Sequence, residues 1–362
     1  MPAKAEPPMD AEGQRLLLRL PDLVRPNGKP AVLVTVFAAQ GSVPRRPGAR
    51  MVCRDGRLLA GTVGGGHLED QALRDANWPS RDSTADADDP GPLATEVHEE
   101  ATETGATRKL IRYPLGAKLA QCCGGAVWLH FEEIDAVRAQ VLADHVHACE
   151  RSGAAFETVF GDRALYESPR PLPVVVIFGA GHVAAALARV LQPLPWRVLV
   201  IDERPAWADP ARFAPGTEVV CAQPLGILAA WGWIGDAARN SVVAQRVQAP
   251  GRRLPVAPPL GATRALVMTH DHALDRDVVE ALLLAQFRCG APMPRLAFVG
   301  MIGSKSKVAA TRQRLGRRGV PEAELQRLVA PIGLLVDGRP LGGNAPGEIA
   351  ISVAAQLLAL HG

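Results

Sequence analysis

The chain has few aromatic residues, little net charge and no long apolar run. Aromatic side chains make up 4 % of its 362 residues, which argues against the base-stacking platforms of proteins that bind single-stranded nucleic acid. A net charge of +3 is too small to draw the chain to a polyanion. No apolar run approaches the ~20 residues that span a bilayer. We therefore expect neither a nucleic-acid partner nor a membrane partner.

Metal-binding and secretion patterns are also missing. The six cysteines form no C-x-x-C pair and no zinc spacing, and the first residues lack the apolar core of a secretion signal. Cysteines of proteins that stay in the cytosol remain reduced. We expect a cytoplasmic protein with free thiols, at Cys53, Cys122, Cys123, Cys149, Cys221 and Cys289.

The N-terminal third is predicted to be rich in strands. The whole chain of 362 residues, 48 % of them hydrophobic, has room for two domains and a sizeable core. The polar stretches 1–12 and 79–95 are predicted loops. Asp55 and Gly56 between two short apolar runs indicate a two-residue hairpin turn. We predict a domain over 1–132 and a connecting helix and linker over 133–172. Its elements are a helix at 14–24, strands at 31–37, 51–54 and 57–60, a helix that opens within 61–70 and runs to 76, and a strand ending at 131.

The remaining residues, 173–362, alternate between apolar runs and helical patterns. Such alternation predicts a doubly wound parallel sheet. The fold class is therefore α/β, with a strand-rich N-terminal domain followed by a C-terminal Rossmann-like doubly wound parallel sheet. The strands are expected at 174–178, 197–201, 218–221, 265–268 and 296–299, and the helices at 182–191, 276–288, 305–316 and 346–360.

A glycine-rich turn follows the first of these strands. Gly179, Gly181 and Ala184 give the pattern G-x-G-x-x-A between a strand and a helix. In a Rossmann unit the first glycine makes the turn, the second lets the backbone approach a phosphate, and an acidic residue about twenty positions on binds a ribose hydroxyl. Asp202 stands at that position, and His182 opens the helix. We predict a ligand site here, with a β-α turn that binds nothing as the alternative.

The loop after the fifth strand is a second glycine turn that opens a helix. Gly303, Ser304 and Lys305 form it, and six basic side chains but no acidic one lie between Ser304 and Val320. Helix N-termini and basic side chains bind phosphate groups. This pattern predicts a phosphorylated ligand, with a solvated basic helix face as the alternative.

The loop after the fourth strand carries His270 and His272. Both would reach the same edge of the sheet, where ligands of open α/β sheets bind. The alternative is that Asp271 or Asp275 only caps the next helix. No third ligand lies nearby in sequence, which disfavours a metal site.

Two further motifs lie in the N-terminal domain. Gly64, Gly65 and Gly66 could cradle an anion or form a tight joint between strand and helix. Cys122 and Cys123 precede two glycines that leave room for a large ligand, and a thiolate is a soft metal ligand. Adjacent side chains on a strand point in opposite directions, so both thiols cannot share one metal. The alternative is two small buried hydrophobic residues.

Taken together, these motifs resemble the XdhC/CoxI family. They occur in the family's order over most of the chain, from about 31 to 360. The matching stretches are GSVPRRPGARM at 41–51, GTVGGGHLE at 61–69, QCCGG at 121–125, GAGHVA at 179–184, IDERP at 201–205, THDHALD at 269–275, GMIGSKSK at 300–307, PIGL at 331–334 and EIAIS at 348–352. Two departures are the insertion at 79–95 and a long link after PIGL, where Asn344 or Ala345 replaces the usual Thr or Ser cap.

The resemblance implies a chaperone of the molybdenum cofactor in its molybdopterin form. Such a protein holds the cofactor while its terminal sulfur ligand is installed and passes it to apo xanthine dehydrogenase, without a turnover reaction of its own. It implies a cysteine desulfurase and cofactor-synthesis proteins as further partners. It also assigns the metal end of the cofactor to Cys123, with Cys122 second.

Two other functions remain open from the residues alone. The Rossmann fingerprint by itself would favour an NAD(P)-dependent oxidoreductase, for which His270 and His272 are the only acid or base candidates. A redox sensor using Cys122 or Cys123 is a weaker alternative. The sequence leaves open whether the cofactor is a monophosphate or a dinucleotide, and it leaves open the oligomeric state, a homodimer included.

Overall fold

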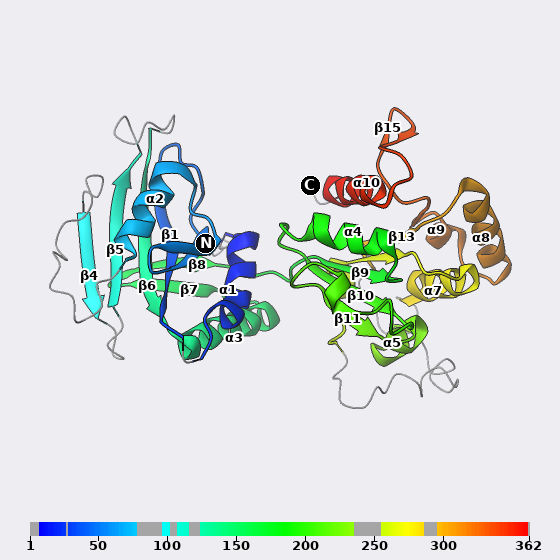
Figure 1. The fold of residues 1–362 in the computed structure, drawn as a ribbon, viewed down its shortest axis with the longest axis horizontal. Helices are drawn as coiled ribbons and strands as arrows, with labels where there is room; N and C mark the ends of the chain where they lie inside the picture. Colours follow the sequence, from blue (N-terminus) through cyan, green and yellow to red (C-terminus); the bar gives the residue numbers. More distant parts are fainter. Residues whose placement is uncertain are drawn as a thin grey trace, which may run out of the picture. The chain divides into compact units, whose positions relative to one another are not determined.

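The computed structural model describes residues 7–26, 28–77, 96–101, 107–115, 124–234, 255–285 and 295–360. The chain divides into two compact units, residues 1–170 and 171–362, which are described separately (Figure 1). The predicted loop at 79–95 and the cysteines at 122 and 123 lie outside the described residues. None of the described helices is long and apolar enough to cross a membrane.

The first unit is built on an antiparallel sheet with the strand order β3-β2-β1-β6-β5-β4. The predicted hairpin is confirmed, because Asp55 and Gly56 join β2 and β3 with φ angles of 49° and 67°. Positive φ at both central residues is what a type I′ turn requires. The strands are β1 Ala31–Gln40, β2 Arg50–Arg54, β3 Arg57–Gly61, β4 Glu96–Ala101, β5 Thr107–Pro114 and β6 Ala126–Ile134.

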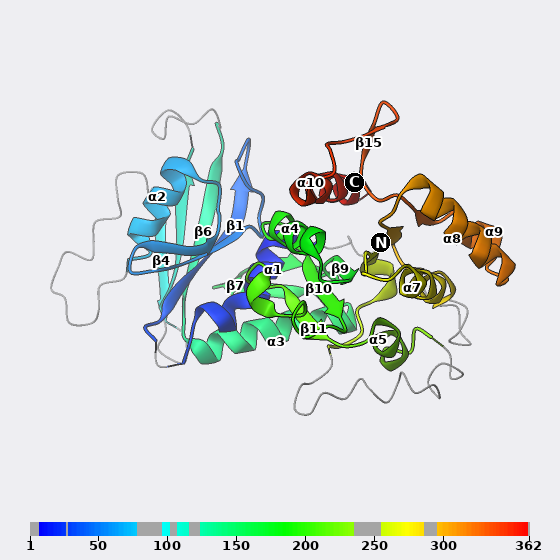
Figure 2. The same cartoon turned by 45° about the vertical axis from the view of Figure 1, so that its right-hand side comes forward.

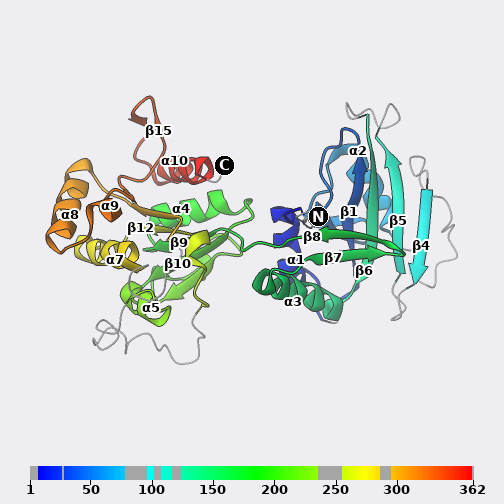
Figure 3. The same ribbon diagram turned by 180° about the vertical axis from the view of Figure 1, so that it is seen from behind.

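Helices cover both faces of this sheet. The helices α1 (Ala11–Leu23) and α3 (Ala136–Ser152) pack together on one face, as Figure 3 shows, and α2 (Gly66–Asp75) packs on the other. β1 is therefore buried on both faces from Ala31 to Phe37, which explains its unbroken apolar run.

The region predicted to connect the two domains contains the expected helix, α3, but differs from the expectation after it. After α3, the chain forms a hairpin of β7 (Phe156–Phe160) and β8 (Arg163–Glu167). Glu167 forms a buried ion pair with Arg50 of β2, and Phe160 packs against Phe37 of β1. α3 and this hairpin are therefore part of the first unit, which extends to residue 170.

A buried histidine lies between this hairpin and the sheet. His130 of β6 is 1 % exposed, with its ring centroid 6.1 Å from that of Phe37 and 5.8 Å from that of Phe160. Its Nε2 has no hydrogen-bond partner among the residues that the structure describes. Burial lowers its pKa to about 4; nearby Glu132 opposes this shift and Arg108 adds to it. The imidazole is thus held neutral in the folded chain.

We expect this histidine to destabilise the fold in mild acid. The unfolded chain binds a proton at His130 below pH ~6.5 and the folded chain only below about 4, so protons favour unfolding between these values. Lowering the pH from 7.5 to 5 should remove about 2 kcal/mol of unfolding free energy through this group. Urea unfolding at both pH values measures it. The His130→Phe variant keeps a ring but cannot bind this proton. On the same change of pH it should lose about 2 kcal/mol less unfolding free energy than the wild type. An equal loss in both would contradict the prediction.

The second unit is built on a parallel sheet with the order β11-β10-β9-β12-β13-β14. The first strand along the chain, β9, lies at the centre between β10 and β12, and every neighbouring pair is parallel. The predicted doubly wound sheet is confirmed, with the strand order of a Rossmann fold. The strands are β9 Val174–Phe178, β10 Arg197–Asp202, β11 Glu218–Cys221, β12 Thr263–Val267, β13 Phe298–Met301 and β14 Leu328–Val329.

Alternate residues of β9 point into two different cores. Val175 and Ile177 pack under α4 (His182–Leu191) and α10 (Pro346–Ala359), which lie side by side in Figure 2. Val174, Val176 and Phe178 face the other layer of helices. That layer consists of α5 Pro224–Ala230, α7 His272–Leu284, α8 Lys305–Arg317 and α9 Glu322–Leu325.

Candidate anion-binding site

The glycine turn after β9 has the geometry that its sequence predicts. Gly179 has φ 111°, and a Cβ at this position would overlap the carbonyl oxygen of Met268, so only glycine fits. Gly181 is the N-cap of α4 and makes no side-chain cap. A Cβ on Gly181 would meet no atom of the described residues within 4 Å. A side chain at this N-cap position therefore has room in the described part of the chain.

We expect Gly181→Val to leave the chain folded and to weaken binding of a phosphorylated ligand. The new side chain has room in the unliganded chain, but it would fill the space in front of the helix N-terminus. Ligand affinity and the thermal midpoint should be measured together. Gly179→Val is the contrasting variant, because it should lower the thermal midpoint. Unchanged affinity in folded Gly181→Val would argue against a phosphate at this turn.

Asp202 lies at the end of β10, but its carboxylate is engaged within the chain. The residue is 3 % exposed, and it accepts hydrogen bonds from the Ala180 N–H at 2.8 Å and from Arg204. Arg204 donates through its backbone N at 2.9 Å, Nε at 2.9 Å and Nη2 at 2.7 Å. Burial would raise the pKa of Asp202, but these hydrogen bonds outweigh it and lower the pKa. Asp202 thus holds the glycine turn and Arg204 in place.

The glycines at 64–66 of the first unit form a joint that is filled by the chain itself. Glu69 accepts hydrogen bonds from the Thr62 hydroxyl at 2.7 Å and from the N–H groups of Val63 and Gly65 at 3.2 and 3.1 Å. A carboxylate therefore already occupies the position that a bound anion would take. This geometry supports the tight joint between strand and helix.

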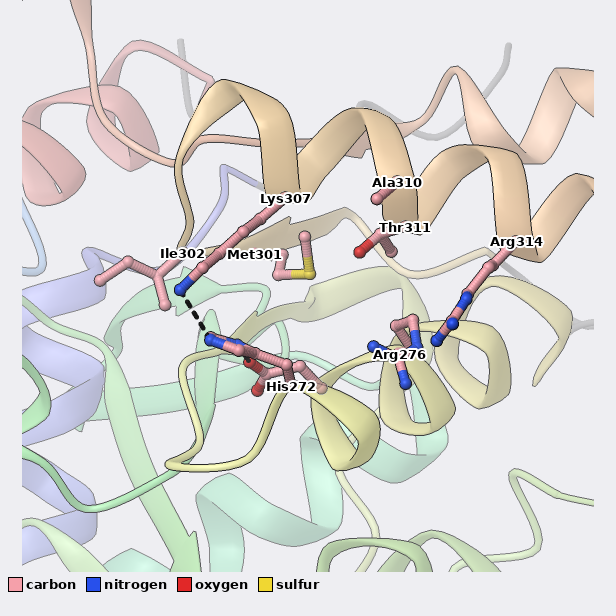
Figure 4. Close-up of a pocket in the computed structure, with 9 residues that line it drawn as sticks. His272, Arg276, Met301, Ile302, Lys307, Ala310, Thr311 and Arg314 are labelled. Carbon is pink, nitrogen blue, oxygen red and sulfur yellow. Dashed lines mark hydrogen bonds and ion pairs between the residues drawn. The ribbon is translucent and has the colours of Figure 1, made fainter.

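A pocket of about 240 Å³ opens between α7 and α8, beyond the carboxyl end of β13 (Figure 4). Met301 and Ile302 supply its apolar part. Each helix supplies three polar side chains: His272, Asp275 and Arg276 from α7, and Lys307, Thr311 and Arg314 from α8.

Positive charge dominates this pocket. Arg276, Lys307 and Arg314 face one carboxylate, that of Asp275, which accepts hydrogen bonds from the Thr269 N–H at 2.9 Å and hydroxyl at 2.7 Å. Burial raises the pKa of Asp275, and the Thr269 and His272 contacts offset this only in part. Within the described residues, Arg276 and Arg314 have no ion-pair partner, and the buried Nε of Arg276 has no hydrogen-bond partner. The pocket is suited to an anion.

One contact joins the two helices that line the pocket. The Lys307 ammonium lies 2.6 Å from Nε2 of His272, and Nδ1 of the same ring lies 3.6 Å from the Asp275 carboxylate. An ammonium group can only donate, so Nε2 must accept and the ring must be neutral. The proton of the neutral imidazole is then on Nδ1, on the side of Asp275.

The structure brings together some of the residues predicted at this edge. Ser304 caps α8 and accepts a hydrogen bond from the Lys307 N–H at 3.4 Å, and Gly303 and Lys305 flank it. His270 is exposed in the loop before α7, and Asp271 caps that helix, as one alternative predicted. No group of metal-binding side chains is found in the part of the chain that the structure describes.

Several basic side chains after Ser304 have internal roles. Arg318 pairs with Asp277 and Glu280 of α7 at 2.7 Å each, and Arg312 donates to the Leu328 carbonyl at 2.9 Å. Some of the basic side chains in this predicted basic stretch therefore contact other parts of the fold, and others line the pocket.

The pocket residues that the sequence did not reveal share a simple spacing. His272 and Arg276 are four positions apart on α7, and Lys307, Thr311 and Arg314 follow i, i+4, i+7 on α8. Residues with this spacing share one helix face. This signal could have identified Arg276, Thr311 and Arg314.

Comparisons with known proteins agree with this architecture. The sequence model of the XdhC Rossmann domain matches residues 175–357, and that of the XdhC and CoxI family matches 24–83. The uncharacterized Escherichia coli protein YqeB is 24 % identical over 329 residues, which are 91 % of this chain and 43 % of YqeB. The chain thus spans less than half of that relative.

Two further proteins match over nearly their whole length. A probable xanthine dehydrogenase subunit of Bacillus subtilis is 21 % identical, over 93 % of this chain and 95 % of that protein. The crystal structure of a xanthine dehydrogenase from Bacillus halodurans covers 97 % of this chain and 96 % of its own, with a TM-score of 0.56 and 20 % identity, a likeness of fold. Because the XdhC Rossmann match alone covers just over half of the 362 residues, the chain belongs to the XdhC and CoxI family.

Proposed function

We propose that this chain is an accessory protein that binds the molybdenum cofactor and delivers it to apo xanthine dehydrogenase. Membership of the XdhC and CoxI family supports this function, as does the name of the Bacillus subtilis relative. The observation that carries the proposal is the pocket between α7 and α8, where Arg276, Lys307 and Arg314 surround a space of about 240 Å³. Once delivered, the cofactor supplies the molybdenum centre of the dehydrogenase.

The pocket fits one part of such a cofactor. Sites that bury a whole drug-sized ligand measure roughly 300–1,000 Å³, so this pocket is suited to a phosphate-bearing end and not to the whole pterin. Arg276 and Arg314 would bind the phosphate oxygens, and Thr311 could donate its hydroxyl. A soft donor for the metal end is proposed at Cys123, outside the described residues.

The geometry gives less support to the alternative of an NAD(P)-dependent oxidoreductase. Asp202, which would bind the ribose, has its carboxylate occupied by Ala180 and Arg204. His272, a candidate acid or base, accepts from Lys307. We therefore propose a carrier without turnover chemistry of its own, with a cysteine desulfurase as the source of the sulfur ligand.

The proposal is tested on the full-length chain purified from molybdenum-replete cells. We expect bound molybdenum and pterin fluorescence above the level of an unrelated protein purified in parallel. The loaded chain should also activate apo xanthine dehydrogenase. Neither molybdenum nor pterin above the control level would reject the proposed function.

A further inference from the structure

We propose that anion binding in the pocket between α7 and α8 takes up a proton at His272, because Lys307 leaves the imidazole to contact the anion. This inference rests on the proposed function of the pocket as a phosphate site. It adds to that site a residue, His272, whose uptake of a proton is coupled to the binding of the anion. The affinity for phosphate then depends on pH.

The first step concerns the chain without an anion. Lys307 donates to Nε2 of His272 over 2.6 Å, which blocks the only ring position that could accept a proton. The other charged groups that line the pocket with this ring are Asp275 and Arg276 on α7 and Arg314 on α8, while β13 contributes the apolar Met301.

The second step is the movement of Lys307. This residue is exposed and has four rotatable bonds, so its ammonium can turn without disturbing the packing of α8. Figure 4 shows its side chain extending from α8 toward α7, with its end directed at His272. An anion between Arg276 and Arg314 would attract that ammonium more strongly than a neutral imidazole does.

The third step is the protonation of the ring. When Lys307 contacts the anion, Nε2 is left without a partner beside a negative charge. A proton taken from the solvent then makes Nε2 a donor to the anion, while Nδ1–H still faces the Asp275 carboxylate, 3.6 Å away. Binding is therefore coupled to the uptake of up to one proton, and affinity falls as the pH rises.

Calorimetry of inorganic pyrophosphate binding to the full-length chain tests this inference. Titrations at one pH in buffers of different protonation enthalpy give the number of protons taken up. A series from pH 6.5 to 8.5 gives the affinity, which should fall by up to about tenfold per pH unit through His272. Because pyrophosphate itself titrates in this range, His272→Gln is the reference.

The expected result is a proton uptake that is smaller in His272→Gln than in the wild type, by up to one proton, and a flatter pH profile in the variant. Equal uptake in both forms would overturn the proton link while leaving the anion site intact. An absence of pyrophosphate binding to the wild type under all conditions would overturn the anion site and this inference together. If such a chain still bound molybdenum, the cofactor would have to bind outside this pocket.

Discussion

Replacing both Arg276 and Arg314 by alanine is expected to weaken pyrophosphate binding by roughly a hundredfold or more. Each guanidinium supplies charge-assisted hydrogen bonds, which contribute about 1.5–3 kcal/mol apiece. The two side chains come from different helices and line the same pocket, so their loss removes most of its positive charge. Affinity is measured by calorimetry for the wild type, both single variants and the double variant.

Arg317→Ala is the matched control for this experiment. Arg317 is an exposed arginine on α8, as Arg314 is, but it does not line the pocket. The Arg317→Ala substitution should change the affinity for pyrophosphate little. In the wild type, this affinity should fall as added salt screens the charges of the pocket. If Arg317→Ala weakens binding as much as Arg314→Ala does, α8 is a diffuse basic surface. Affinity that does not change with salt would lead to the same conclusion.

The parallel sheet was predictable because its strands are buried on both faces. A strand such as β9, Val174–Phe178, must be apolar at every position, and the glycine turn that follows fixes where its helix begins. The order of the five predicted strands along the chain then leaves few topologies, and the Rossmann order is the one observed.

Strands with little burial were not predictable in the same way. β4, Glu96–Ala101, is an exposed edge strand with the sequence EVHEEA, and no apolar alternation marks it. The hairpin of β7 and β8 is joined to the sheet by the ion pair between Arg50 and Glu167, which are 117 positions apart. Such a tertiary contact leaves no local pattern, so the hairpin was predicted as part of a linker.

The candidate site shows the same division between local and tertiary signals. The role of Gly179 is predictable from the strand and the helix on either side of it. His272 is predictable as a candidate because it lies just after the end of a strand. The engagement of Asp202 by Arg204 depends on side-chain packing that its position after β10 does not specify. The pocket itself requires α7 and α8 to lie side by side, with Arg276 facing Arg314 across it.

The second large effect is expected for Cys123→Ser, which should remove most of the molybdenum bound per chain. Molybdenum with sulfur ligands is a soft centre, and a thiolate is the soft donor that the chain offers beside Gly124 and Gly125. Serine has nearly the same volume as cysteine but is a hard and weakly acidic donor. The variant should stay folded by circular dichroism and fail to activate apo xanthine dehydrogenase.

Other cysteine variants separate this role from general effects of losing a thiol. Cys122→Ser should lose less molybdenum, because adjacent side chains on an extended chain point in opposite directions. Cys221→Ser, at a described and partly exposed thiol, should retain it. Cys53 is a poor substitute as a ligand, since it is buried and burial raises its thiol pKa to about 11. Full molybdenum content and activation in Cys123→Ser would make this thiol a packing residue, whereas a larger loss in Cys122→Ser would move the soft donor to its neighbour.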